Sequence, residues 1–270
     1  RSWIRIKIGI ILTPSNRSKA YLKKIISNNL KLDKIIFLNN NQEEKYTKKE
    51  IEESKKCGFD LSESIKDLLE NNKLVYKEYS FVDINHPELI KFIRRCNIDY
   101  FIFSGGGILK REILEVGPKF IHLHPGILPF YRGSTCFYYS IINEDKCGVT
   151  AFIMDESLDA GDIITQKTFP KPNYVNIDSV YDSHIRSETL IHVLKNKLLE
   201  KCGCTHNHYL CNDCCSDINK CPICLQILSS EICPICMNKN DLIDTECGNG
   251  HKVCGICIIN IIIYNSKCPF

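Results

Sequence analysis

The sequence predicts an α/β fold with a mostly parallel sheet, followed by a small cysteine-rich region. Three observations support this division. Short apolar segments alternate with amphipathic or polar segments through residues 1–200. Several of the apolar segments end at glycine, histidine or proline, which is typical of strands that run into functional loops. Of the 17 cysteines, 13 lie in the last 70 residues.

The order of elements follows from the apolar periodicity. The first run, Ile6 to Leu12, is β-branched and ends at Thr13-Pro14-Ser15, which predicts a buried strand, a loop and a helix start. Similar runs predict further strands at residues 34–38, 74–81, 100–103, 120–124, 148–154 and 163–169. Amphipathic segments predict helices at residues 19–28, 62–71, 87–95, 135–143 and 178–199. Strands that alternate with helices favour parallel pairing with right-handed crossovers.

One segment between these elements has a different composition. Residues 39–56 are polar and charged, which indicates a solvated loop and an exposed helix.

Composition excludes several classes of function. Residues 1–200 hold 30 Lys and Arg against 26 Asp and Glu, and residues 201–270 hold 5 against 6, so neither part predicts a nucleic-acid surface. The first turn, Thr13 to Ser18, lacks a Gly-x-Gly-x-x-Gly fingerprint, which disfavours a nicotinamide cofactor. We expect no membrane segment and no signal peptide, and therefore a reducing, cytoplasmic compartment in which clustered cysteines bind metal.

Two histidines mark the predicted strand at residues 120–124. Strand alternation places His122 and His124 on one face, with Leu123 on the other. Buried imidazoles need hydrogen-bond partners, so a pair at a strand end favours a chemical role over core packing. Asp159 follows the next strand, and the adjacent Gly161 would let backbone come close.

Two longer motifs carry a family resemblance. His122–Gly133 (HLHPGILPFYRG) and Gly148–Ile164 (GVTAFIMDESLDAGDII) resemble the formyltransferase catalytic domain family, and the similarity extends from about Ile6 to Glu200. The resemblance implies a Rossmann-like formyltransferase fold over residues 1–200, 10-formyltetrahydrofolate as donor and an amine as acceptor. His124 and Asp159 match the family's catalytic histidine and aspartate. His122 stands where the family has asparagine.

The resemblance also implies roles for these residues. Negative charge develops on the formyl oxygen as the amine attacks, and His122 and His124 would donate hydrogen bonds to it. Because a histidine donates according to its tautomer and protonation, His122 would make activity more dependent on pH than asparagine does. Asp159 would stabilise the His124 imidazolium or accept the amine proton through a water.

Substrate-binding residues are expected on two loops. Arg132, beside Tyr131, is a candidate for a substrate phosphate or for a structural ion pair. By resemblance, part of the pterin pocket comes from Gly105, Gly106, Gly107, Ile108 and Leu109.

The cysteine-rich tail has the spacing of zinc ligands. Its Cys-x2-Cys pairs and interspersed histidines suit tetrahedral Zn(II). The candidate ligands are Cys204, His208, Cys211, Cys214, Cys221, Cys224, Cys233, Cys236, Cys247, His251, Cys254, Cys257 and Cys268. The pattern resembles RING fingers, with a partial unit at residues 201–228 and a second unit at residues 229–270 that we expect to be truncated. In the partial unit, Cys202, Cys215 or His206 could supply absent partners.

Two functions compete. The first is an N-formyltransferase that acts on a small amine, with an amino sugar nucleotide favoured because no OB-type extension is expected after residue 200. The alternative is a RING-type ubiquitin ligase or assembly module whose front domain is inactive or transfers acetyl groups. In that alternative, Pro222 and Ile235 would contact a ubiquitin-conjugating enzyme.

Overall fold

The computed structural model divides the chain into two units, Arg1–Asn196 and Lys197–Phe270, each described by itself. It describes residues 6–42, 44–105, 107–133, 136–156, 159, 161–173, 175–196, 198–199, 242–244 and 252–254. In the second unit, β8 (Leu242–Asp244) pairs antiparallel with β9 (Lys252–Cys254). The first unit carries the predicted α/β fold.

A seven-stranded sheet in the order β3-β2-β1-β4-β5-β6-β7 forms the centre of the first unit. Its strands are β1 (Ile8–Leu12), β2 (Lys34–Leu38), β3 (Lys77–Tyr79), β4 (Tyr100–Phe103), β5 (Lys119–His124), β6 (Lys146–Ile153) and β7 (Ile163–Pro170). All pairings from β3 to β5 are parallel, whereas β6 is antiparallel to both β5 and β7. The mostly parallel sheet predicted from the sequence is therefore confirmed.

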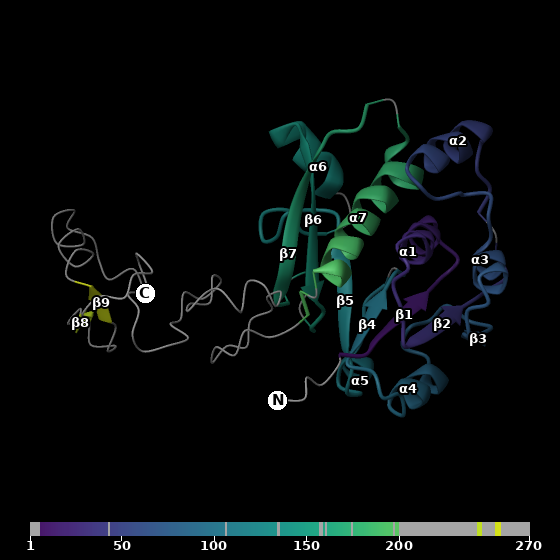
Figure 1. Ribbon diagram of the computed structural model, residues 1–270, viewed down its shortest axis with the longest axis horizontal. Helices are drawn as coiled ribbons and strands as arrows, with labels where there is room; N and C mark the ends of the chain where they lie inside the picture. Colours follow the sequence, from purple (N-terminus) through teal and green to yellow (C-terminus); the bar gives the residue numbers. More distant parts are fainter. Residues whose placement is uncertain are drawn as a thin grey trace. The chain divides into compact units, whose positions relative to one another are not determined.

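Helices cover both faces of this sheet. They are α1 (Asn16–Ser27), α2 (Lys48–Lys56), α3 (Ile65–Asn71), α4 (Pro87–Ile93), α5 (Arg111–Leu114), α6 (Cys136–Glu144) and α7 (Asp182–Lys195), with a π-helical turn, η1 (Ile177–Tyr181), before α7. Figure 1 shows α1 and α7 on one face of the sheet and α4 and α5 on the other. Because both faces are covered, β1 and β4 are apolar along their whole length, as parallel central strands require.

One large apolar cluster fixes α4 and α5 to the sheet. Side chains from β1, β2, β4 and β5 pack there against both helices. The most buried members of the cluster include Ile11, Ile36 and Phe101 from the strands and Leu89 and Ile113 from the helices. Gly9 is part of the same arrangement, because a Cβ at this position would lie 2.4 Å from the Phe101 ring. This close-packed cluster fixes the positions of β4 and β5, whose carboxyl ends carry the site.

Local capping explains where the elements differ from the sequence prediction. Helix α1 begins at Asn16, before the predicted residue 19, because the Ser15 hydroxyl accepts a hydrogen bond from the Ser18 N–H. Within the polar segment 39–56, α2 begins at a capping box formed by Thr47 and Glu50. This helix is less solvated than predicted, since Glu53 is only 8% exposed and accepts from Asn176 N–H.

Two further elements differ in extent. The short helix α5 was not predicted, and the closing helix α7 covers only the middle of the predicted segment 178–199. Across the described residues, every helix is too short or too polar to cross a bilayer.

Candidate active site

The site lies where β5 ends. On one side of β5 the parallel register with β4 stops at the pair Ile102 and Ile121. On the other side the antiparallel register with β6 continues to the pair His124 and Thr150. The last residues of β5, including both histidines, therefore extend beyond the end of the parallel ladder, which is where open α/β sheets place their ligand sites.

His124 is 2% exposed and uses both ring nitrogens within the protein. Its Nε2 lies 2.8 Å from the carbonyl oxygen of Tyr131 and 3.3 Å from the Cys136 thiol sulfur. Because a carbonyl can only accept, Nε2 carries the proton and donates it to Tyr131. The neutral imidazole therefore has its lone pair on Nδ1.

Asp159 faces that lone pair. Its Oδ2 lies 3.5 Å from His124 Nδ1 and accepts a hydrogen bond of 3.0 Å from Gly133 N–H. Burial lowers the pKa of His124, while the Asp159 carboxylate raises it. The arrangement lets Nδ1 take up a proton and places a carboxylate to stabilise the resulting imidazolium.

Gly161 brings the Asp159 loop back toward β5. Strand β6 runs away from the end of β5 and finishes opposite Ile121, yet Asp159 lies beside His124. A Cβ at Gly161 would lie 1.8 Å from the Ile153 carbonyl oxygen, so only glycine fits there. The close backbone approach expected at Gly161 is therefore present.

His122 has an unused ring nitrogen. Its Nδ1 is buried and has no hydrogen-bond partner among the described residues, while the ring makes an edge contact with Phe152 at 6.0 Å between centroids. Burial, followed by the charges of Arg186 and Arg17, holds the pKa of His122 well below 6.5, against a small opposing effect of the Phe103 carbonyl. His122 is therefore a neutral imidazole whose Nδ1 is free to bond to a water or to a bound molecule.

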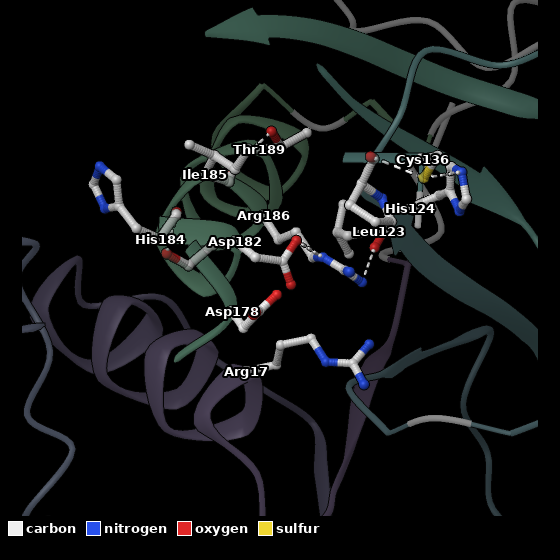
Figure 2. A network of polar contacts seen from close by, with 12 residues as sticks. Arg17, Leu123, His124, Cys136, Asp178, Asp182, His184, Ile185, Arg186 and Thr189 are labelled. Carbon is white, nitrogen blue, oxygen red and sulfur yellow. Dashed lines mark hydrogen bonds and ion pairs between the residues drawn. The ribbon is translucent and has the colours of Figure 1, made fainter. Parts of the chain in front are cut away.

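The sequence analysis missed two charged residues behind the histidines. Arg186 is 7% exposed, its Nε lies 2.7 Å from Asp182 Oδ1, and its Nη1 donates to the Leu123 carbonyl at 2.8 Å. Figure 2 shows the guanidinium between the Asp182 carboxylate and β5. The signal available in the sequence was an Asp and an Arg four residues apart in a helix, a spacing at which the two side chains can pair.

The loop after His124 is held by buried polar contacts. The Thr150 hydroxyl donates to the Gly126 carbonyl at 2.6 Å and accepts from Leu128 N–H at 3.1 Å. The Cys136 thiol donates to the Pro125 carbonyl at 3.1 Å, which explains why a cysteine is buried here. Burial raises the pKa of Cys136 to about 11, so this thiol is a packing and hydrogen-bonding group at neutral pH.

The predicted substrate residues Tyr131 and Arg132 lie on the same loop but differ in their contacts. Tyr131 supplies the carbonyl that holds His124, and its hydroxyl donates to Glu144 at 2.6 Å. Arg132 is exposed. The protein thus uses Tyr131 to orient the site.

The predicted pterin loop follows β4. Gly105 is close-packed, since a Cβ would lie 2.6 Å from the Phe103 ring, and Gly107 has a positive φ of 107°. Leu109 is 4% exposed, whereas Ile108 is 75% exposed. The amide of Asn85, a residue that the sequence analysis missed, bonds to the Ile108 carbonyl at 3.0 Å and the Lys110 N–H at 2.8 Å. Gly106 lies outside the described residues.

The candidate zinc ligands between Cys204 and Cys268 lie outside the described residues, apart from the backbone of Cys254 at the end of β9. Among the residues that are described, no group of three or more His, Cys, Asp or Glu side chains could hold a metal ion.

Comparison with known proteins identifies relatives of the first unit. Residues 5–192 match the family described as Formyl transferase. The methionyl-tRNA formyltransferase of Ehrlichia canis is 34% identical over 134 residues, which cover 45% of this chain and 44% of that protein. The enzyme of the same description from Clostridioides difficile is 37% identical over 133 residues, covering 47% and 42%. The chain spans less than half the length of these curated relatives.

Solved structures share the fold. The phosphoribosylglycinamide formyltransferase from Anaplasma phagocytophilum superposes with a TM-score of 0.52 at 16% identity, covering 77% of this chain and 95% of that one. A formyltetrahydrofolate deformylase from Pseudomonas syringae gives a TM-score of 0.51 at 16% identity, covering 72% and 61%. At these identities the likeness shows the fold alone, and it confirms the Rossmann-like architecture predicted for residues 1–200.

Proposed function

The chain belongs to the formyl transferase family, and on that premise we propose that it moves a formyl group from 10-formyltetrahydrofolate to an amine. The observation that carries this proposal is the contact between His124 Nδ1 and Asp159 Oδ2, 3.5 Å apart at the end of β5, beside the unpartnered Nδ1 of His122. His124 is a candidate proton acceptor, and His122 is a candidate hydrogen-bond donor to the formyl oxygen; amine formylation requires both functions.

The donor fits the residues around β4 and β5. The orphaned His122 Nδ1 offers a polar contact, and the exposed Ile108 beside the glycine-rich loop offers an apolar one for a flat ring. We assign the backbone of Gly105, Gly107, Ile108 and Leu109 and the exposed side chain of Ile108 to donor binding; the Leu109 side chain is buried in the core. When bound, 10-formyltetrahydrofolate supplies an electrophilic formyl carbon.

His124 is the proton acceptor in this proposal. Its Nε2–H is engaged with the Tyr131 carbonyl, so Nδ1 is the atom that receives the amine proton. Asp159 then stabilises the imidazolium. This refines the sequence prediction, in which His124 also donated to the formyl oxygen, because both of its nitrogens already have a neighbour in the protein.

His122 is the donor to the developing negative charge. A neutral imidazole donates from one nitrogen only, so His122 serves this role when its proton moves from the nitrogen that faces the Phe103 carbonyl to Nδ1. An asparagine amide donates without such a condition. The low pKa of His122 means that the tautomer, and not the charge, decides its activity at neutral pH.

The acceptor is an amine with an anionic group, for which an amino sugar nucleotide is one candidate. Arg17, in the first turn of α1, supports this class. None of the ion pairs among the described side chains involves Arg17, and Figure 2 shows its guanidinium pointing away from Asp178. Burial, followed by the charge of Arg186, lowers the pKa of Arg17, while Tyr21, Asp182 and Glu44 act in the opposite direction. A phosphate would compensate this cation. Arg132 is a second candidate cation on the solvent side.

The test combines binding and turnover on the full chain. Isothermal titration with a stable 10-formyltetrahydrofolate analogue measures donor binding, and an acceptor panel of amino sugar nucleotides, glycinamide ribonucleotide and methionyl-tRNA measures formylation. Micromolar donor binding with formylation of one acceptor supports the proposal. A folded chain without donor binding overturns it. His124→Ala should abolish turnover while donor binding persists.

We also propose that the cysteine-rich residues 201–270 bind zinc as RING-type units. The support is the ligand spacing of Cys221-Pro-Ile-Cys224 and Cys233-Pro-Ile-Cys236, which suits tetrahedral thiolate sites. Metal analysis of the full chain purified without chelator should find bound zinc, and Cys233→Ser should reduce the amount. Absence of zinc would contradict the proposal. Chain formation with a ubiquitin-conjugating enzyme tests the ligase alternative.

A further inference from the structure

Arg186 lies beside the end of β5, where the pairing of β5 with β4 has stopped. The parallel register of β4 and β5 ends at Ile121, so the residues after it have no strand partner on that side. A buried carbonyl without a donor is costly. The Leu123 carbonyl, between the two histidines, accepts instead from Arg186 Nη1 at 2.8 Å. A side chain from α7 thus replaces a backbone donor at the point where the site begins (Figure 2).

The guanidinium is itself held in place. Its Nε is 2.7 Å from Asp182 Oδ1 one helical turn earlier, and both side chains are largely buried, at 8% and 16% exposure. A buried pair of this kind loses much of its Coulomb energy to desolvation, so its contribution to stability is small. Its hydrogen bond to β5 is specific, because the planar guanidinium donates to both partners in a fixed geometry.

The pair also acts on the site through its charges. Burial is the largest cause of the lowered pKa of both histidines; Arg186 lowers both pKa values further, and Asp182 raises that of His124. The other groups that face the histidines are Arg17 from α1, which lowers the pKa of His122, and Asp159 from the β6–β7 loop, which raises that of His124. Cys136 on α6 touches His124 Nε2 as a neutral thiol.

From these contacts we infer that Arg186, held by Asp182, is a positioning residue that fixes the carboxyl end of β5 and places a positive charge behind His122 and His124. The inference rests on the proposed formyl transfer for its functional meaning. In this proposal α7 contacts neither the formyl carbon nor the amine. It acts on the reaction through the two histidines.

The test is a titration of histidine ring nitrogens by 15N NMR on the full chain. Signals are assigned with His122→Asn and His124→Asn. Arg186→Met removes the positive charge and the donor at similar volume, so both histidines should titrate at higher pH than in the parent. Asp182→Asn removes the negative charge, so His124 should titrate at lower pH. A general loosening of the fold would raise the pKa of both histidines in both variants. It cannot raise the pKa of His124 in Arg186→Met and lower it in Asp182→Asn.

Two further variants separate position from charge. Arg186→Lys keeps the charge but lacks the fork that reaches both partners, so the titrations should stay near the parent while kcat falls by about a hundredfold and the donor KM stays unchanged. Glu188→Gln removes an ion pair of α7 with Lys24 that does not reach β5, and it should change neither quantity.

The outcomes are distinct. Unchanged titrations of both histidines in folded Arg186→Met, or an upward shift of His124 in Asp182→Asn, overturn the inference. If Arg186→Met does not fold, the sign of the Asp182→Asn shift decides. If the parent chain transfers no formyl group, the proposed function fails, while the titrations still test whether Arg186 and Asp182 control the histidines.

Discussion

The two halves of the seven-stranded sheet contribute to the site in different ways. From β3 to β5 the strands are parallel, and β1 and β4 are buried on both faces. In the antiparallel half, β7 alternates between more and less exposed residues. The parallel half is a rigid support that ends in two histidines, and the antiparallel half returns a carboxylate to them. The site exists because the two halves meet at β5.

We expect the antiparallel half of the sheet to be essential for turnover because it supplies the Asp159 carboxylate. Asp159→Asn keeps the size of the residue but removes the charge beside His124 Nδ1, and we expect turnover to fall by about ten thousandfold, as when a carboxylate that supports a histidine is neutralised. Steady-state formylation kinetics measure this loss. Asp162→Asn, an exposed position in the same loop, is the matched control and should retain activity. Equal effects of the two changes would mean that the loop acts only structurally.

At the end of the parallel half, His122 should act as a hydrogen-bond donor. His122→Ala should lower turnover by about a hundred- to a thousandfold, the usual cost of removing one donor to a developing oxyanion. His122→Asn should retain the activity of the parent or exceed it, because an amide donates without a tautomer requirement. Because the pKa of His122 is held well below 6.5, its charge does not change above that pH, and the pH dependence of turnover above pH 6.5 should be the same in His122→Asn and in the parent. If asparagine is as damaging as alanine, donation by His122 is excluded.

The close packing of the parallel half can be tested by stability. Gly9→Ala places a methyl group 2.4 Å from the Phe101 ring and should lower the free energy of unfolding by about 1–3 kcal/mol. Thr168→Ala, at an exposed position of β7, should change it by less than about 0.5 kcal/mol. Urea unfolding measures both. Adding Phe101→Leu to Gly9→Ala should recover part of the loss, and a purely additive double variant would argue against the steric explanation.

The smallest expected effect is on the pH dependence of stability. The pKa values of His122 and His124 lie below 6.5 in the folded chain, so the unfolded chain binds protons at higher pH. Stability is therefore unaffected by these groups well above pH 6.5 and is lost as the pH falls from there through the folded pKa values. His122→Asn should lose less stability over that interval than the parent does. Urea unfolding at pH 7 and at pH 5 measures the loss of stability in each protein. If that loss is the same in His122→Asn and in the parent, His122 is not the group responsible.

The sequence by itself determined the succession of strands and helices up to β5 and their mostly parallel pairing, because apolar β-branched runs separated by amphipathic helices leave few other arrangements. It also identified His122, His124 and Asp159 as candidate site residues, because they lie in short motifs with a recognisable pattern. Only the tertiary structure decided how these groups are used. Arg186 and the Tyr131 carbonyl reach β5 from helix α7 and from a loop, and hydrogen bonds between such distant segments leave little trace in local periodicity. The orientation of the His124 ring and the lack of a partner for His122 Nδ1 depend on those contacts. The orientation and tautomer of an imidazole are fixed by the groups that surround it in space.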